Sequence, residues 1–202
     1  KVVSAGIDIS IHDEHAMVTT TLELSRVNDM PFVLNGRDLT LHEISIDGRL
    51  LDEADWPVVP EGLSFIGLPD SCVLRVRSQC HPQTNTSLDG LYLSGGMYCT
   101  QCEPEGFRRM AFFPDRPDVM TVFTVRIEAD KSFPQLLSNG NLVSTEEFPA
   151  INNSGVVMHS AVWVDPFRKP AYLFALVAGD LVALEDTFTT LSGRKVALKI
   201  WT

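Results

Sequence analysis

Hydrophobic and polar residues alternate with a period of two along much of this chain. The pattern is clear from Ile7 to Ile11, from Val18 to Leu24, from Leu39 to Ile46 and from Val122 to Glu128. Alternation rich in β-branched residues is typical of strands with one buried and one solvated face. The sequence therefore predicts a chain made mostly of β-strands.

Glycine-containing turn dipeptides punctuate these strands. They occur at Asn35-Gly36, Asp47-Gly48, Asn139-Gly140 and Ser192-Gly193. Such pairs accept the positive φ angles of tight hairpin turns at little steric cost. Consecutive hairpins without intervening amphipathic helices predict an all-β fold, either an antiparallel β-sandwich or a curved, saddle-like sheet.

Two segments interrupt the alternation. The stretch from His81 to Leu88 is polar and irregular, and the spacing of apolar residues from Glu103 to Phe112 predicts a short helical turn. No internal repeat or change of composition marks a linker. The economical prediction is a single domain over residues 1–202.

Composition narrows the classes of partner. With 45% hydrophobic residues the chain can bury a full core, and its formal net charge of −10 should repel a phosphate backbone. Nucleic acid is therefore not an expected partner. The longest apolar run, Ala171–Ala178, is far shorter than the roughly 20 residues of a membrane-spanning helix, so no membrane span is expected.

Four cysteines are too few for a disulfide scaffold in a chain of this length, which favours a reducing, cytoplasmic location. Cys99 and Cys102 form a C-x2-C pair, but Cys72 and Cys80 lie at the two ends of one predicted strand, too far apart to complete a metal site easily. Ordinary thiols are the preferred interpretation. The tetrapeptide His12 to His15 carries metal-ligand side chains, but its position between two strands indicates a solvated turn.

Hydrophobic patterning does not explain the run from Thr100 to Val119, which mixes charged residues with aromatic ones. In an extended stretch Gln101 and Glu103 would project from the same face. A carboxylate beside an amide oxygen suits an ammonium ligand, because both groups accept its hydrogen bonds. The alternative is a surface cluster of ion pairs, in which Glu103 and the neighbouring Glu105 pair with arginines 108 and 109.

Several motifs of the chain, in the same order, resemble the N-terminal domain of the aminopeptidase N family of zinc peptidases. They are Asn85–Tyr92, Cys99–Arg108, Asp115–Val119, Leu137–Asn141, Asp165–Phe167 and Tyr172–Asp180. The resemblance implies that Gln101 and Glu103 help to bind the free α-amino group of a peptide substrate. It also implies that this β domain packs on a catalytic domain.

In such an enzyme zinc belongs to the catalytic domain, and no His-Glu-x-x-His or Gly-x-Met-Glu-Asn motif occurs in this sequence. The resemblance therefore implies a zinc aminopeptidase whose catalytic domain lies beyond Thr202, with no zinc in this chain and no activity of this chain alone. It further implies a cis bond between Glu103 and Pro104, since X-Pro bonds have only a small trans preference. The alternative function is a non-catalytic β-sandwich interaction module.

Overall fold

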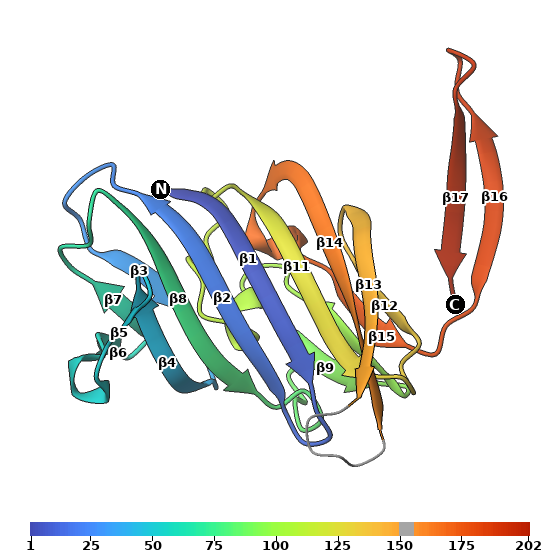
Figure 1. The fold of residues 1–202 in the computed structure, drawn as a ribbon. Coiled ribbons are helices and arrows are strands. Elements are labelled where there is room, and N and C mark those ends of the chain that lie inside the picture. The colour runs from blue at the N-terminus through green and yellow to red at the C-terminus, as the bar shows by residue number, and fades with distance from the viewer. Residues whose placement is uncertain (150–155) are drawn as a thin grey trace.

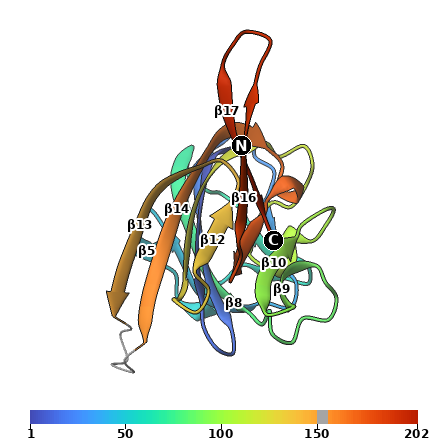
Figure 2. The same ribbon diagram turned by 90° about the vertical axis from the view of Figure 1, so that its right-hand side faces the viewer.

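The computed structural model describes residues 1–149 and 156–202, and the regular structure of these residues is β apart from three short 3-10 helices. Their strands form four sheets (Figure 1). The largest sheet is curved, and the smaller sheets lie mainly on one side of it (Figures 1 and 2). The all-β prediction of layered, curved sheets is confirmed.

Within the described residues the largest sheet has eight strands. In order of pairing they are β13 (Asn141–Pro149), β14 (Val157–Lys169), β11 (Thr121–Asp130), β1 (Val2–Ile11), β2 (Ala16–Ser25), β8 (Ser71–Cys80), β4 (Thr40–Ile46) and β5 (Arg49–Leu50). Neighbouring strands are antiparallel except β1 and β11, which run parallel. The sequence had predicted hairpins throughout and not this parallel pair.

The remaining sheets of the described chain are smaller. The four-stranded sheet has the order β12 (Gln135–Ser138), β15 (Leu176–Gly179), β10 (Met97–Gln101) and β9 (Gly90–Ser94). The three-stranded sheet has the order β3 (Phe32–Asn35), β7 (Gly62–Phe65) and β6 (Val58–Val59). The last sheet is a hairpin of β16 (Ala183–Thr189) and β17 (Lys195–Trp201). The 3-10 helices are Glu53–Asp55, Phe107–Arg109 and Ala171–Leu173.

Alternation in the sequence becomes alternation of burial in the strands. In β1 the side chains of Ile7, Ile9 and Ile11 are buried, while Asp8 is exposed. In β8 every second residue from Cys72 to Cys80 is buried. Each strand thus turns its apolar face to the interior, as period-two patterning predicts.

One apolar core takes side chains from the eight-, four- and three-stranded sheets. Its aromatic centre includes Phe107, whose ring centroid lies 4.9 Å from that of Phe113 and 5.2 Å from that of Phe174. Phe107 is fully buried and stands on the 3-10 helix Phe107–Arg109, inside the segment predicted to form a helical turn. Removing so large a buried ring costs about 3–5 kcal/mol, so it anchors this polar segment firmly to the core.

Two of the four predicted hairpin turns are correct. Asp47-Gly48 joins β4 to β5 with positive φ angles, and Ser192-Gly193 lies between β16 and β17. Asn35-Gly36 and Asn139-Gly140 instead connect strands of different sheets, so the hairpin prediction is wrong there. At both positions glycine lets the backbone pack closely against a neighbouring group. A Cβ at residue 36 would lie 2.2 Å from the Phe112 ring, and one at residue 140 would lie 2.3 Å from the carbonyl oxygen of Val164.

The β16–β17 hairpin projects away from the layered sheets (Figures 1 and 2). Its two strands pair in register from Ala183 with Trp201 to Thr189 with Lys195. The loop from His81 to Leu88 contains no strand, as predicted. In the described part of the chain, no helix has the length and apolar character needed to cross a membrane.

Candidate functional site

The chain bends back sharply directly after β10, which ends at Gln101. The next residue, Cys102, is buried, and the backbone N–H of Gly106 donates to the carbonyl oxygens of Cys102 at 3.4 Å and Glu103 at 3.2 Å. A Cβ atom on residue 106 would lie 2.5 Å from the carbonyl oxygen of Gln101, too close for any side chain. Glycine at this position therefore allows the tight turn that follows Glu103.

Gln101 and Glu103 stand on either side of buried Cys102, and both are exposed. Because side chains alternate along an extended segment, the burial of Cys102 turns its two neighbours outward together. Neither side chain has a hydrogen-bond or ion-pair partner among residues 1–149 and 156–202. The turn thus presents an amide and a carboxylate with free acceptor atoms.

The two neighbouring arginines are paired with carboxylates other than Glu103. Arg108 Nη1 lies 2.9 Å from a carboxylate oxygen of Glu105, and Arg108 Nε lies 3.1 Å from Asp115 Oδ2. Arg109 pairs with Asp38 and lies 3.9 Å from a carboxylate oxygen of Asp89. The ion-pair alternative is therefore correct for Glu105 with Arg108, and it is wrong for Arg109, whose partners are Asp38 and Asp89.

Asp115 is the buried member of this network. Its side chain is 4% exposed, and Oδ2 also accepts a hydrogen bond from the backbone N–H of Arg108 at 3.1 Å. Burial raises the pKa of Asp115, while the hydrogen bonds and charge of Arg108 act in the opposite direction. Because Arg108 compensates the charge of Asp115, this buried carboxylate does not destabilise the folded state as an unpaired one would.

Residues 59–173, more than half of the chain, match the family described as the Peptidase M1 N-terminal domain. The chain belongs to this family. It is 48% identical over 193 residues to aminopeptidase N of Caulobacter vibrioides and 42% identical over 206 residues to aminopeptidase N of Escherichia coli. These matches cover 95% and 100% of this chain, but only 22% of the length of each relative.

Solved structures agree with this M1 assignment. The crystal structure of Legionella pneumophila aminopeptidase A in complex with aspartic acid superposes with a TM-score of 0.84 at 29% identity. That match covers 99% of this chain and 24% of the Legionella chain. Gln101 and Glu103 lie inside the range that matches the M1 N-terminal domain.

The predicted cis bond in this M1 domain is at the wrong position. Among the described residues the cis peptide bond joins Pro104 to Glu105, and the bond between Glu103 and Pro104 is trans. Gly106 N–H donates to the carbonyl oxygen of Glu103, so the Pro104–Glu105 bond is the central one of the four-residue turn. The chain reverses at that central bond, one residue later than the prediction.

The cysteines and histidines of the M1 domain do not gather into a metal site. In residues 1–149 and 156–202, no group of three or more His, Cys, Asp or Glu side chains is arranged to hold a metal ion. All four cysteines are free thiols. The His12–His15 segment is the turn between β1 and β2, as predicted. A zinc ion therefore does not fit the described residues of this chain.

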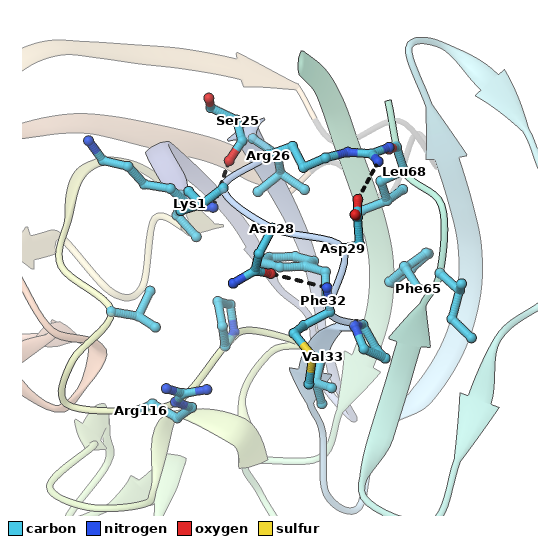
Figure 3. Close-up of a pocket in the computed structure, with 18 of the residues that line it drawn as sticks. Lys1, Ser25, Arg26, Asn28, Asp29, Phe32, Val33, Phe65, Leu68 and Arg116 are labelled. Atoms are coloured by element: carbon cyan, nitrogen blue, oxygen red, sulfur yellow. Dashed lines mark hydrogen bonds and ion pairs between the residues drawn. The ribbon is translucent and has the colours of Figure 1, made fainter. Parts of the chain in front are cut away.

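An open groove of about 1080 Å³, which the sequence analysis did not predict, lies beside the first residues of β1 (Figure 3). The loop from Arg26 to Pro31 forms one wall, and Phe32 and Phe65 contribute apolar surface. Arg26 is already paired with Asp29 at 3.1 Å. Neither Gln101 nor Glu103 lines the groove, so it is separate from the turn after β10.

Asp115 as the partner of Arg108 was also not predicted. The one signal in the sequence was an acidic residue directly after the apolar run Met110–Pro114, where a solvated charge is not expected. Nothing in the local sequence indicates that Asp38 pairs with Arg109, because 71 residues separate the two.

Proposed function

We propose that this chain is the N-terminal domain of a zinc aminopeptidase that removes N-terminal amino acids from peptides. In this proposal Gln101 and Glu103 help to bind the α-amino group of the substrate. Two relatives named aminopeptidase N, together with the structural likeness to an aminopeptidase A, support the assignment. Four free thiols support a cytoplasmic location.

The observation that carries the proposal is the unpaired carboxylate of Glu103 beside the free amide of Gln101. A substrate ammonium placed there would donate hydrogen bonds to the amide oxygen of Gln101 and to the carboxylate of Glu103, which also carries the opposite charge. At an effective dielectric of about 20 and a separation of about 4 Å, the attraction between the two charges is about 4 kcal/mol before desolvation. Water weakens this attraction at an open surface, so a covering catalytic domain would strengthen it.

The geometry also explains why such an enzyme would remove one residue at a time. A carboxylate that requires a charged amine holds the peptide by its end, so the first peptide bond lies at a constant distance from the anchor. An internal segment of a peptide lacks the ammonium and gains nothing from Glu103. Selection for the chain end thus follows from one charged contact.

In this proposal the zinc ion and the groups that hydrolyse the peptide bond belong to a catalytic domain outside these 202 residues. The chain spans 22% of the length of its aminopeptidase N relatives, and its described residues offer no metal site. We therefore assign zinc and the hydrolytic groups to a catalytic domain on which this β domain packs. The 202-residue chain alone is expected to be inactive, because it contains no His-Glu-x-x-His motif.

The test is Glu103→Gln in the full-length protein. The change removes one charge at nearly constant volume, so we expect KM for an aminoacyl substrate to rise by about tenfold, the loss of a charge-assisted contact, with unchanged zinc content. Glu23→Gln is the matched control, because Glu23 is exposed on β2 and also lacks a partner among the described residues. Its kinetics should equal those of the parent.

Parent-like KM for Glu103→Gln would remove the assigned role of Glu103. A full-length parent without peptidase activity and without zinc would leave the non-catalytic interaction module as the better description. Loss of folding in this variant would instead favour a structural role for Glu103. Steady-state kinetics, zinc analysis and thermal unfolding of the same samples separate these outcomes.

A further inference from the structure

Arg108 joins three segments of the chain through its side chain and its backbone. Its guanidinium contacts Glu105 through Nη1 at 2.9 Å and Asp115 through Nε at 3.1 Å, while Nη2 donates to the carbonyl oxygen of Asp115 at 3.0 Å. Its own carbonyl oxygen accepts from the N–H of Arg37 at 2.8 Å. The side chain is 19% exposed and therefore largely removed from water.

This arrangement bears on the charge of the turn. Glu103 and Glu105 stand two residues apart, and both are exposed. Of these two residues only Glu105 has a cationic partner, because Arg108 pairs with it as well as with buried Asp115. Without that pairing two carboxylates would compete for one ammonium, and the cation would be held at a less definite position.

Arg109 cannot replace Arg108 in this task. It is directed to Asp38 and Asp89, which belong to other segments of the chain. The described residues thus supply no cation to Glu103, while each neighbouring arginine has carboxylate partners of its own. Among the described acidic residues around the turn, Glu103 is thus free, whereas Glu105, Asp115, Asp38 and Asp89 each lie beside an arginine.

We propose that Arg108 is a positioning residue for the amine site: by tying Glu105 to Asp115 it fixes the turn and leaves Glu103 as the carboxylate that receives the substrate ammonium. This inference rests on the proposed function. Arg108 itself touches no substrate in this description and acts through the turn.

The experiment compares variants of the full-length enzyme with an aminoacyl anilide as substrate. Arg108→Gln frees Glu105 and loosens the turn, so KM is expected to rise by about fivefold to tenfold while kcat per zinc stays within about twofold of the parent. Arg75→Gln is the matched control, because Arg75 pairs with Glu43 at 3.0 Å on the eight-stranded sheet. This control should keep the parent KM.

Two further readouts separate positioning from a merely structural role. A free amino acid as competitive inhibitor should bind Arg108→Gln more weakly, whereas its analogue without the amino group should bind both enzymes equally. Adding Glu105→Gln to Arg108→Gln should restore much of the KM, because the competing charge is removed. If the role of Arg108 were merely structural, Arg108→Gln would lower the amount of active enzyme. The relative affinities of the two inhibitors would then equal those of the parent, and Glu105→Gln would not restore the KM.

Parent-like KM for Arg108→Gln overturns the proposal, and so does a double variant no better than Arg108→Gln alone. If Arg108→Gln does not fold, Arg108→Lys decides: a single ammonium cannot hold both carboxylates as a planar guanidinium does, so KM should rise by about threefold. An unchanged KM there also overturns the proposal. Glu103→Gln keeps the two hypotheses apart, since its effect on KM tests the amine site without involving Arg108.

Discussion

The four cysteines of this chain differ in how far a reagent can reach them. Cys72, Cys80 and Cys102 are buried, whereas Cys99 is only half-buried. Burial raises the pKa of Cys80 to about 12 and also raises the pKa values of Cys72 and Cys102, because a thiolate is disfavoured away from water. A thiol reacts through its thiolate, so the three buried side chains are protected from a reagent both by restricted access and by their raised pKa values.

We therefore expect a disulfide reagent at about pH 8 to label Cys99 first in the folded chain. The other three thiols should react at comparable rates only after a denaturant is added. Absorbance of the released thiolate counts the reactive groups, and Cys99→Ser should remove the early phase. Rapid labelling of Cys80 in the folded protein would contradict the burial described above.

At the scale of elements, the turn between β1 and β2 brings imidazoles together. The ring centroids of His12 and His15 are 4.9 Å apart, and His81 Nδ1 lies 3.2 Å from the carbonyl oxygen of Glu14. Partial burial lowers the pKa of His15, and the charges of His12, His81 and His42 lower it further, while Glu14 opposes them. The folded turn thus favours neutral His15.

The folded state should lose stability as the pH falls below about 6.5, because the unfolded chain then binds a proton at His15 more readily than the folded chain does. The loss continues until the pH passes below the lowered pKa of folded His15. His15→Gln should flatten this part of the profile, and Glu14→Gln should steepen it. Urea midpoints measured across this range provide the test, and matching profiles for parent and His15→Gln would refute it.

Elements differ in how well local sequence predicts them. The alternating residues of β1 and β8 indicate both the strands and their buried faces, since burial follows the period of the strand. The same rule predicts the outward direction of Gln101 and Glu103. It cannot predict which strands pair, nor that Asp115 is the partner of Arg108, because those contacts depend on how the chain packs in three dimensions.

At the scale of the whole molecule, the β16–β17 hairpin has two unlike faces. Register places Asp186, opposite Leu198, and five apolar side chains on one face: Leu184, Phe188, Val196, Leu198 and Ile200. The opposite face carries the ion pair of Glu185 with Lys199 at 2.6 Å. Since the hairpin projects from the layered sheets (Figure 2), its apolar face lacks a cover within the described residues.

The 202-residue chain in isolation should therefore self-associate through this face. Leu198→Asp should shift the population toward monomer, because it places a second carboxylate opposite Asp186 within the apolar face. Thr187→Asp is the control, since register puts position 187 on the polar face. Sedimentation velocity over a range of concentrations measures the effect, and equal association of the Leu198→Asp variant and the parent would argue against it.

The parallel pairing of β1 with β11 also has a kinetic consequence. The hydroxyl of Ser10 on β1 donates a hydrogen bond of 2.9 Å to the carboxylate of Glu128 on β11, although 118 residues separate the two along the chain. Contacts of such high sequence separation slow folding, because a large loop must close before they form. During synthesis β1 therefore leaves the ribosome with an unpaired edge and waits for β11, a period in which this edge is open to aggregation.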